Sequence, residues 1–505
     1  MSTLVRQPGG GVPVAVDRVW HLLIDGELVA AEGGRTLDVF APATGEIVTR
    51  VPAASVVDVD RAVAAARSAF ESWHWRPTTE RAGLVHRLAN AIEAHAEELA
   101  LIDTIDNGTP LRVMRGDAGL AADQLRYFAG LALEIKGDTI PAPECDALDF
   151  TLREPFGVVA RIVPFNHPLM FAASKLGAPL VTGNTVVLKP SQQTSLSALR
   201  LGELCREIFP PGVVNVLSGR GSEIGDHLAR HPDVARLALT GSVAVGRRLQ
   251  EQAAQSVVKV VTLELGGKNP IIVFADADHD AALDGAMTGM NFAWQGQSCG
   301  STSRLYVHRS RFEDFIAEMG ARINSLVVGH PLDEGSDVGA IVSRSQLDSV
   351  VRYIKGGLAN PRARLIAGGL DAVDGVPRGG WYLRPTLFAI DDDHDIVLAE
   401  EEIFGPVLVA VPFDSYDDVI ARANRLPLGL TASVWTGDLS TALSAVRDLE
   451  TGYVWVNASS RHVPGAPFGG VKDSGVGREE SIDELMSYTQ IKNAYIRFER
   501  PGGAA

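Results

Sequence analysis

The first long pattern along the chain is helical. From residue 60 to residue 101, Ala, Leu and Val recur at spacings of three and four residues, as in RAGLVHRLANAIEAHAEELALI, and this period predicts helix. Turn-forming residues at 107–110 (NGTP) end the run. A second helical pattern covers residues 119–135. The stretch 146–165 is predicted to be extended, because apolar and polar positions alternate in its first half.

The region from residue 184 to residue 267 alternates short apolar runs with amphipathic ones. The predicted order is strand 185–190, helix 197–209, strand 213–219, helix 223–231, strand 236–242, helix 245–255 and strand 257–267. Strands that alternate with helices predict an α/β fold with a parallel, doubly wound sheet. Ligands of such sheets bind at the carboxyl ends of the strands.

A second α/β pattern covers residues 269–413. It begins with an apolar strand, continues through a helix predicted at 280–296 and a strand at 304–309, and reaches a last strand after the Gly405-Pro406 break. The segment 487–498 is predicted to be a late strand, of the kind that often pairs with a neighbouring chain. The Gly-rich start and the PGGAA end are expected to be disordered.

Composition and charge narrow the class of protein. The 505 residues suggest two to four domains, and 46% hydrophobic with 21% charged residues is ordinary for a globular protein. The net charge of -16 argues against nucleic acid as a partner, since phosphate binding needs a basic face. We find no signal-peptide pattern and no run of about 18 apolar residues, so we expect a cytoplasmic protein with no membrane partner.

The cysteines are too few and too scattered for a disulfide framework or a zinc site, and they indicate a reducing compartment. They are Cys145, Cys205 and Cys299. Cys299 is the candidate nucleophile, because the glycines at 296 and 300 let a substrate approach its sulfur closely. The alternative is a buried cysteine that only packs.

Two more polar residues stand at the ends of predicted strands. Glu264 is followed by two glycines and is placed to face a ligand, unless it is a solvated loop glutamate. Asn166, in VPFNHP, can donate from its amide to an oxyanion, unless it is a turn residue before a proline. Gly241 and Gly246 bracket a strand-to-helix turn whose N–H groups suit a pyrophosphate, although the spacing does not match G-x-G-x-x-G.

Seven blocks together carry a resemblance to the NAD(P)-dependent aldehyde dehydrogenase superfamily, of the hydrolytic, non-acylating type. They follow the order of the family and span nearly the whole chain: PFNHP (164–168), GNTVVLKPSQQT (183–194), TGSVAVG (240–246), LELGGK (263–268), GQSCG (296–300), EEIFGP (401–406) and PFGGVKDSGVGRE (467–479). The resemblance implies a Rossmann-like cofactor domain (1–132 and 156–267), an α/β catalytic domain (268–480) and a small β oligomerisation element (133–155 and 481–505), in a homodimer or homotetramer.

The resemblance also assigns roles to matching positions. Cys299 falls on the nucleophile, Glu264 on the general base and Asn166 on the oxyanion donor, with the Cys299 backbone N–H as second donor. Lys175 and Glu479 fall on residues thought to relay the proton from Glu264. The cofactor is expected to be NAD, with NADP possible, and no metal is implied. The cofactor residues are Val163, Pro164, Phe165, Lys189, Ser191, Gln192, Gly225, Thr240, Gly241, Ser242, Gly246, Leu265, Glu402 and Phe404.

These roles imply oxidation of an aldehyde to the acid through a thioester on the cysteine. A thiolate adds to the aldehyde, a hydride leaves to the nicotinamide, and Glu-activated water hydrolyses the thioester. A rival is an acylating enzyme that passes the thioester to coenzyme A, but such members usually lack a glutamate at position 264. Another rival is a catalytically silent protein on this fold, which the intact set of catalytic residues disfavours.

The chain departs from the usual family pattern at a few positions. Gln192 stands where NAD-preferring members usually carry glutamate, and Leu239 replaces a common phenylalanine. The departures leave the cofactor preference and the substrate open. The expected substrate residues are His167, Phe171, Ser298, Arg461, His462 and Phe468.

The two histidines stand where the family often carries aromatic rings. They either pack as flat substitutes for phenylalanine or, with Arg461, form a polar mouth. A polar mouth suits a polar or aromatic aldehyde, and its positive charge counts against betaine aldehyde.

Overall fold

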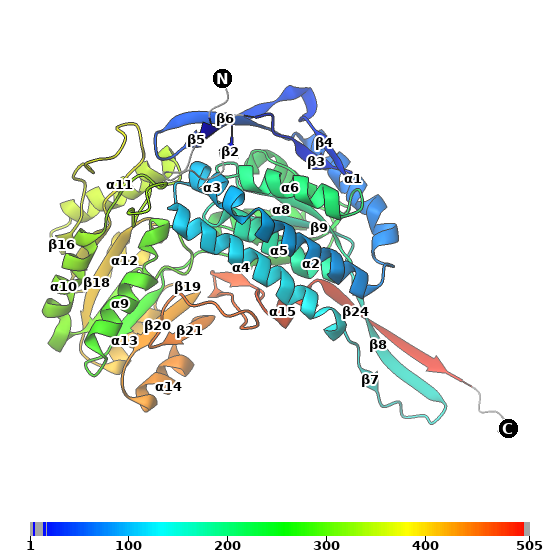
Figure 1. Ribbon diagram of the computed structural model, residues 1–505. Helices are drawn as coiled ribbons and strands as arrows, with labels where there is room; N and C mark the ends of the chain where they lie inside the picture. Colours follow the sequence, from blue (N-terminus) through cyan, green and yellow to red (C-terminus); the bar gives the residue numbers. More distant parts are fainter. Residues whose placement is uncertain (1–3, 6–13, 17, 499–505) are drawn as a thin grey trace.

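The computed structural model describes all residues except 1–3, 6–13, 17 and 499–505. Two α/β bodies lie side by side, and a long antiparallel arm extends from one of them (Figure 1). The glycine-rich start and the PGGAA end lie outside the described residues. The fold class is α/β, as the alternation of strands and helices predicts.

The first body is built on an eight-stranded sheet in the order β23-β13-β12-β9-β10-β11-β3-β4. Its five central strands are parallel, and β23, β3 and β4 are antiparallel to their neighbours. Every residue of β9 and β10 is buried, as expected for parallel strands that helices cover on both faces. The strands are β3 (Leu22–Ile24), β4 (Glu27–Val29), β9 (Val158–Ile162), β10 (Thr185–Lys189), β11 (Val214–Val216), β12 (Val234–Thr240), β13 (Val260–Glu264) and β23 (Gly475–Val476).

The helices of this body differ from the sequence expectation in their ends. The pattern at 60–101 forms three helices, because Pro77 starts a new one and His95 separates the next. The helix predicted from residue 119 begins at Leu111, directly after Pro110, and glycines at 116 and 119 obscure its pattern. The helices are α1 (Val56–Trp73), α2 (Thr78–Ala94), α3 (Ala96–Asn107), α4 (Leu111–Gly130), α5 (Pro168–Val181), α6 (Leu196–Ile208), α7 (Asp226–Arg230) and α8 (Val243–Ala254).

The second body is built on a seven-stranded sheet in the order β16-β17-β18-β15-β14-β20-β21, parallel except at β16. The helix predicted at 280–296 ends at Gly289, because Asn291 takes a left-handed conformation with φ 54°. The strands are β14 (Pro270–Val273), β15 (Arg304–His308), β16 (Ala363–Ala367), β17 (Thr386–Ile390), β18 (Val407–Phe413), β20 (Thr431–Trp435) and β21 (Tyr453–Val456); the helices are α9 (His279–Gly289), α10 (Phe312–Ser325), α11 (Arg344–Ala359), α12 (Val397–Glu400), α13 (Tyr416–Asn424) and α14 (Leu439–Asp448).

The arm is a three-stranded antiparallel sheet. Its strands are β7 (Thr139–Ile140), β8 (Ala147–Pro155) and β24 (Thr489–Arg497), and β24 follows the short helix α15 (Ile482–Ser487). The late strand expected at 487–498 thus exists, and within this chain it pairs with β8 along its whole length. Smaller two-stranded pairings join β1 (Leu4–Val5) to β2 (Val14–Ala15), β5 (Thr36–Ala41) to β6 (Glu46–Pro52), and β19 (Leu428–Gly429) to β22 (Val471–Lys472).

The strand register of the first sheet gathers the predicted cofactor residues. Lys189 at the end of β10 pairs with Ile162 at the end of β9, and Thr240 at the end of β12 pairs with Glu264 at the end of β13. The carboxyl ends of four parallel strands therefore lie at one edge. The strand β23 joins this sheet although it falls in the range expected for the catalytic domain, and the expected domain boundaries stay a prediction.

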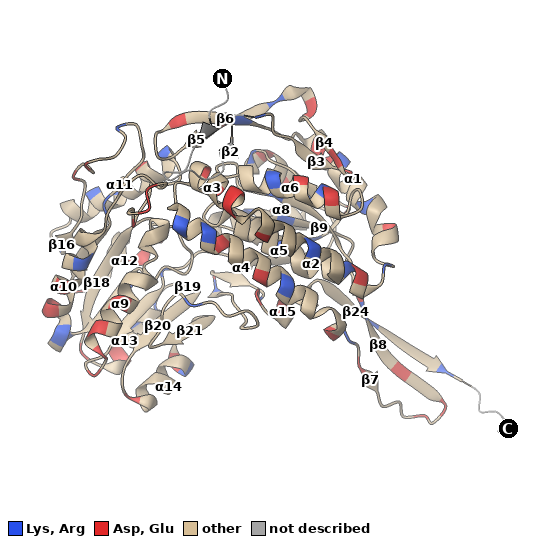
Figure 2. Cartoon of the chain, in the orientation of Figure 1, with Lys and Arg blue, Asp and Glu red and all other residues tan. Residues whose placement is uncertain are grey.

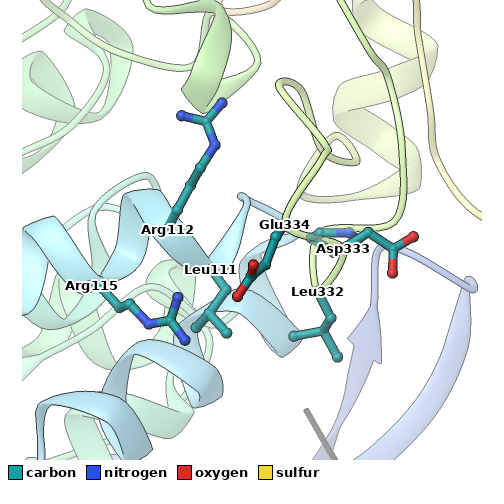
Figure 3. A pocket seen from close by; sticks show the side chains of 7 residues that line it. Leu111, Arg112, Arg115, Leu332, Asp333 and Glu334 are labelled. Carbon is teal, nitrogen blue, oxygen red and sulfur yellow. The ribbon is translucent and has the colours of Figure 1, made fainter. Parts of the chain in front are cut away.

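Two surface features complete the description. Blue and red ribbon segments both occur on α2, α4 and α10, so both signs of charge share these helices (Figure 2). A hollow of about 310 Å³ lies between the start of α4 and the loop at 331–334 (Figure 3). Its lining contains none of the predicted site residues, so it has no link to the predicted chemistry.

Asn184 holds three separate segments of this body together, which generates a stability prediction. Its Oδ1 accepts N–H bonds from Phe156 and Gly157 at 2.8 and 3.1 Å, and its Nδ2 donates to the carbonyl of Tyr488 at 2.9 Å. Because the side chain is fully buried, Asn184→Ala should lower the free energy of unfolding by about 2–4 kcal/mol.

The measurement is denaturant or thermal unfolding followed by circular dichroism. The matched control is Asn493→Ala, which removes one exposed hydrogen bond to Asp149 and should cost less than about 1 kcal/mol. Equal losses in the two variants would contradict a bridging role for Asn184.

Candidate active site

The edge of the first sheet offers a place for a nucleotide. The backbone N–H of Val163 donates to the carbonyl of Lys189 at 3.1 Å, so the two loops leave the sheet together. The Lys189 side chain is buried, its Nζ donates to the carbonyl of Pro190 at 2.8 Å, and burial lowers its pKa to about 8. A Cβ at Gly225 would lie 3.9 Å from the Lys189 Cδ, which places that glycine beside the lysine. Gln192 is exposed.

Helix α8 begins where β12 ends and presents its N-terminus at the same edge. Ser242 caps it by accepting the Val245 N–H at 3.4 Å. A Cβ at Gly246 would lie 2.8 Å from Leu265, so glycine allows the close packing of α8 on the loop after β13. The Thr240 hydroxyl is buried without a partner. Free N–H groups, a helix dipole and an unpaired hydroxyl together fit a diphosphate.

The loop that carries Cys299 is held in a strained and crowded path. Asn291 and Gln295 have φ of 54° and 55°, and a Cβ at Gly296 would lie 2.3 Å from the carbonyl oxygen of Gly405. The Asn269 Nδ2 donates to the carbonyls of Cys299 at 2.7 Å and Ser301 at 3.0 Å. These contacts fix the backbone on which the thiol stands.

Cys299 is half-buried among acidic groups. Burial, and then the charges of Glu402, Glu264 and Glu480, raise the pKa of its thiol to about 12, although the Gly300 N–H opposes the shift. In the site without cofactor the thiol is therefore almost entirely protonated at neutral pH.

Glu264 and Asn166 are among the buried residues of the described chain that have side-chain polar atoms without a hydrogen-bond partner. Neither carboxyl oxygen of Glu264 has a partner, and the Asn166 Oδ1 has none either. Burial first, and then the charge of Glu479, raise the pKa of Glu264 well above its usual range. A Cβ at Gly469 would lie 2.7 Å from the Glu264 Oε1, so glycine leaves room for this carboxyl. Unpaired buried polar atoms of this kind indicate a ligand or water site.

Behind Glu264 lies a buried cluster of charges. Lys175 approaches Glu479 with its Nζ at 2.8 Å and Glu484 at 3.8 Å, and Arg161 also binds Glu479. Burial raises the pKa of Glu479, but Arg161 and Lys175 more than offset this effect and hold it at about 2. Glu264, Glu479, Glu484 and Tyr488 are among the residues that line a small cavity.

Glu402 and Phe404 lie opposite the sheet edge. The Glu402 Oε1 accepts the Gly267 N–H at 3.1 Å, and a Cβ at Gly266 would lie 1.9 Å from its Oε2. Burial raises the pKa of Glu402 to about 7, against the opposing effects of the Gly267 N–H and Lys268. The Phe404 ring packs edge-on against Phe165, with centroids 5.5 Å apart, although the two come from different bodies.

The expected substrate residues form two ring clusters. His167 lies against Phe171 and Trp294, with centroids 5.6 and 5.3 Å away, and His462 lies 4.7 Å from Phe468. Each histidine Nδ1 also faces a buried carboxylate, Asp117 at 2.8 Å for His167 and Glu480 at 3.1 Å for His462. Phenylalanine could not make these bonds, so the histidines are more than flat packing substitutes. Ser298 is half-buried; Arg461 is exposed and, within the described part of the chain, forms no ion pair.

Several residues that shape the site were absent from the sequence prediction. Arg161 could have been noticed as a charged residue inside the apolar strand VVARI. Asn269 directly follows the LELGGK block. Asp117 and Glu480 carry no sequence signal of their own, because their importance depends on histidines that lie far from them in the sequence.

A comparison with known protein families decides the identity of the fold. The model of the family described as "Aldehyde dehydrogenase family" matches residues 28–494. This chain belongs to the aldehyde dehydrogenase family. The resemblance drawn from the seven sequence blocks is thereby confirmed.

Relatives of this aldehyde dehydrogenase match it along most of its length. It is 43% identical over 487 residues to the phenylacetaldehyde dehydrogenase of Pseudomonas fluorescens, covering 95% of this chain and 96% of that one. The NAD+ complex of an aldehyde dehydrogenase from Bacillus cereus aligns with a TM-score of 0.92 at 40% identity, covering 95% and 97%. A mutant of the indole-3-acetaldehyde dehydrogenase AldA from P. syringae, in complex with NAD+ and IAA, aligns with a TM-score of 0.91 at 40% identity, covering 95% and 96%. These structures confirm the expected fold.

Neither a candidate metal site nor a membrane-spanning helix occurs among the described residues. No group of three or more His, Cys, Asp or Glu side chains there is arranged to hold a metal ion. Among the helices described, none combines the length and the apolar composition that crossing a membrane requires.

The raised pKa of Cys299 makes its reactivity testable in the dehydrogenase without cofactor. Below a pKa of about 12 the thiolate fraction grows tenfold with each pH unit, so the alkylation rate should rise about tenfold per unit between pH 7 and pH 9 without levelling off. Iodoacetamide labelling followed by peptide mass spectrometry measures it, with the exposed Cys145 changed to serine to simplify the mixture. A plateau below pH 9 would show that the protein already stabilises the thiolate.

Proposed function

We propose that the protein oxidises an aldehyde to the carboxylic acid with NAD(P)+, through a thioester on Cys299 that Glu264 helps to hydrolyse. The observation that carries the proposal is the pairing of a backbone-fixed thiol with a buried carboxyl that has no hydrogen-bond partner. The charge of Glu264 also raises the pKa of Cys299, so the two groups interact electrostatically, which supports the proposal.

The residues at the edge of the first sheet fit a dinucleotide. Lys189, Ser191 and Gln192 would hold its adenine ribose, and Ser242 at the α8 N-terminus would hold its diphosphate. The remaining cofactor-binding residues would be Val163, Pro164, Phe165, Gly225, Thr240, Gly241, Gly246, Leu265, Glu402 and Phe404. When bound, the nicotinamide accepts a hydride from the substrate adduct.

Cys299 and Asn166 would carry the first half of the reaction. The Cys299 thiol loses its proton, and the thiolate adds to the aldehyde carbon. The oxyanion that forms takes hydrogen bonds from the Asn166 amide and the Cys299 backbone N–H, which stabilise it where its charge develops. Loss of a hydride from this adduct leaves the acyl group as a thioester on the sulfur.

Glu264 would carry the second half. It removes a proton from the water that attacks the thioester, and the acid leaves as Cys299 regains a free thiol. Glu479 is held ionised by Arg161 and Lys175, and its fixed negative charge raises the pKa of Glu264 and makes that group a stronger base. The proposal includes a relay of protons by Lys175 and Glu479. Because the pKa of Glu479 is about 2, its protonated form would exist only briefly during the relay.

The substrate would be an aldehyde with an aromatic or polar body. Phe171, Phe468 and the two histidines offer rings to it, and two similar proteins carry the names of arylacetaldehyde dehydrogenases. For assembly, we propose a homo-oligomer built through the arm, whose exposed apolar side chains support that role. They are Ile140, Leu148, Leu152, Ile491 and Ile496.

The two halves of the reaction predict different behaviour for variants of Cys299 and of Glu264. Cys299→Ala should bind cofactor and form no NADH. Glu264→Gln should release a burst of about one NADH per site and then turn over at least about 10²-fold more slowly, because glutamine cannot take a proton from water. Because the pKa of Glu264 is raised and its ionised form is the base, the hydrolysis rate of the wild type should increase as pH rises through that pKa.

Stopped-flow absorbance at 340 nm, with phenylacetaldehyde as substrate, measures the burst and the steady state. Glu46→Gln, at an exposed position, is the matched control and should behave as wild type. A steady-state rate in Glu264→Gln equal to that of the wild type would refute the role given to Glu264.

The neutral side chain at position 192, Gln192, leads to a prediction about the preference between NAD and NADP. A neutral amide neither repels a 2′-phosphate nor accepts strongly from both ribose hydroxyls, so we expect NAD to be preferred and NADP to be used measurably. Gln192→Glu should raise the ratio of kcat/KM for NAD over NADP by at least about tenfold through like-charge repulsion. The neighbouring Gln193, which binds Ser343, supplies the control Gln193→Glu. An equal loss with both cofactors would show that position 192 does not face the ribose.

A further inference from the structure

Asp117 is a buried carboxylate in a helix that the proposed mechanism does not use. It lies in α4, opposite the N-terminus of α5, and its relative exposure is only 4%. A charged carboxylate in such a place is costly unless a hydrogen-bond donor compensates it. Within the described residues that donor is the His167 ring, whose Nδ1 lies 2.8 Å from the Asp117 Oδ2.

This pairing decides how His167 faces the substrate. Nδ1–H is committed to Asp117, so the ring nitrogen left for other contacts is Nε2. His167 follows Asn166 directly and precedes α5, so its ring belongs to the same short loop as the proposed oxyanion donor. An aldehyde held by Asn166 therefore has His167 as a neighbour along its body.

A second polar atom in the same cluster has no partner. The Trp294 ring lies 5.3 Å from the His167 ring, and its Nε1 is buried without a hydrogen bond. Trp294 belongs to the loop that leads to Cys299. A buried indole N–H ordinarily finds an acceptor, and its lack of one indicates a ligand or water atom in that place.

We propose that Asp117, His167 and Trp294 form a subsite for a hydroxyl group on the body of the substrate. The hydroxyl accepts from the Trp294 Nε1 and donates to the His167 Nε2, while Phe171 contacts the flat apolar remainder. Asp117 acts as a positioning residue, since it fixes the tautomer and orientation of His167. The preferred substrate is thus a hydroxylated aromatic aldehyde. This inference rests on the proposed function only for the reaction, because the subsite would bind the hydroxylated acid as well.

The repetition of the motif supports a functional pair. His462 makes the same kind of bond to the buried Glu480, and both histidines stand among aromatic rings in the predicted substrate region. If only packing mattered, two histidines and two buried carboxylates would add a desolvation cost that apolar rings avoid. A polar group on the substrate that binds to a histidine would explain why the chain bears that desolvation cost.

The test compares two ligands that differ by one hydroxyl. Calorimetry measures the Kd of phenylacetate and 4-hydroxyphenylacetate, and steady-state kinetics measures kcat/KM for the corresponding aldehydes. In the wild type the hydroxylated ligand should bind about tenfold more tightly, as expected for one or two hydrogen bonds, and its aldehyde should show a similar advantage. His167→Phe and Trp294→Phe should each remove most of this preference while phenylacetaldehyde is still oxidised.

Asp117 is tested through a conservative pair of variants. Asp117→Asn keeps an acceptor for Nδ1–H and should retain more of the preference than Asp117→Leu, an order that a general loss of stability would not produce. Thermal unfolding confirms that each variant is folded. His86→Phe, at an exposed position on α2, is the control and should keep the wild-type preference.

The outcomes separate the two proposals. A hydroxyl preference in acid binding that His167→Phe abolishes supports the subsite even if no aldehyde is oxidised, which would overturn the proposed function alone. The subsite would be overturned if both aldehydes are oxidised with no hydroxyl preference, if His167→Phe leaves the preference unchanged, or if neither acid binds.

Discussion

The site depends most on the hydrogen bonds of one amide side chain. Asn269 stands between β13 of the first sheet and β14 of the second, and its Nδ2 donates to the carbonyls of Cys299 and Ser301. Its Oδ1 accepts the backbone N–H of Thr431, in the second sheet. One buried group therefore ties the nucleophile loop to the junction of both bodies. The backbone that carries the thiol is thereby held beside the segment that joins the two sheets.

Around this fixed backbone the chain buries several carboxyl groups. Glu264 and Glu402 have raised pKa values, and they raise the pKa of Cys299 in turn. Glu479 is compensated by Lys175 and Arg161. In the unliganded site the raised pKa values therefore favour the neutral, protonated forms of Glu264, Glu402 and Cys299. In the proposed reaction, a cationic nicotinamide ring near Cys299 would favour ionisation of the thiol, so that binding of the oxidised cofactor would also activate the proposed nucleophile.

Local sequence was enough to predict most strands of the first sheet, because apolar runs separated by amphipathic segments have few alternatives in a parallel sheet. It also marked Cys299, Glu264 and Asn166 as candidates, because they stand beside glycines or at strand ends, and the roles that the family resemblance gives them stay predictions. Helix ends were less predictable, since the end of α9 depends on the left-handed conformation of Asn291. Asp117 and Glu480 could not be found, because each acts through a histidine that only the tertiary structure brings near.

Two of the site carboxylates occupy space that exists only because a side chain is missing. A methyl group on Gly266 would overlap Glu402, and one on Gly469 would press on Glu264. Drift from glycine to alanine, usually among the mildest changes in evolution, would here displace the chemistry itself. The ring clusters around His167 and His462 are shaped by side chains that are present, and each histidine is bonded to a buried carboxylate. A change in the shape of this wall would therefore require a histidine and its carboxylate to change together, whereas the positions of Glu264 and Glu402 require only that two glycines stay glycines.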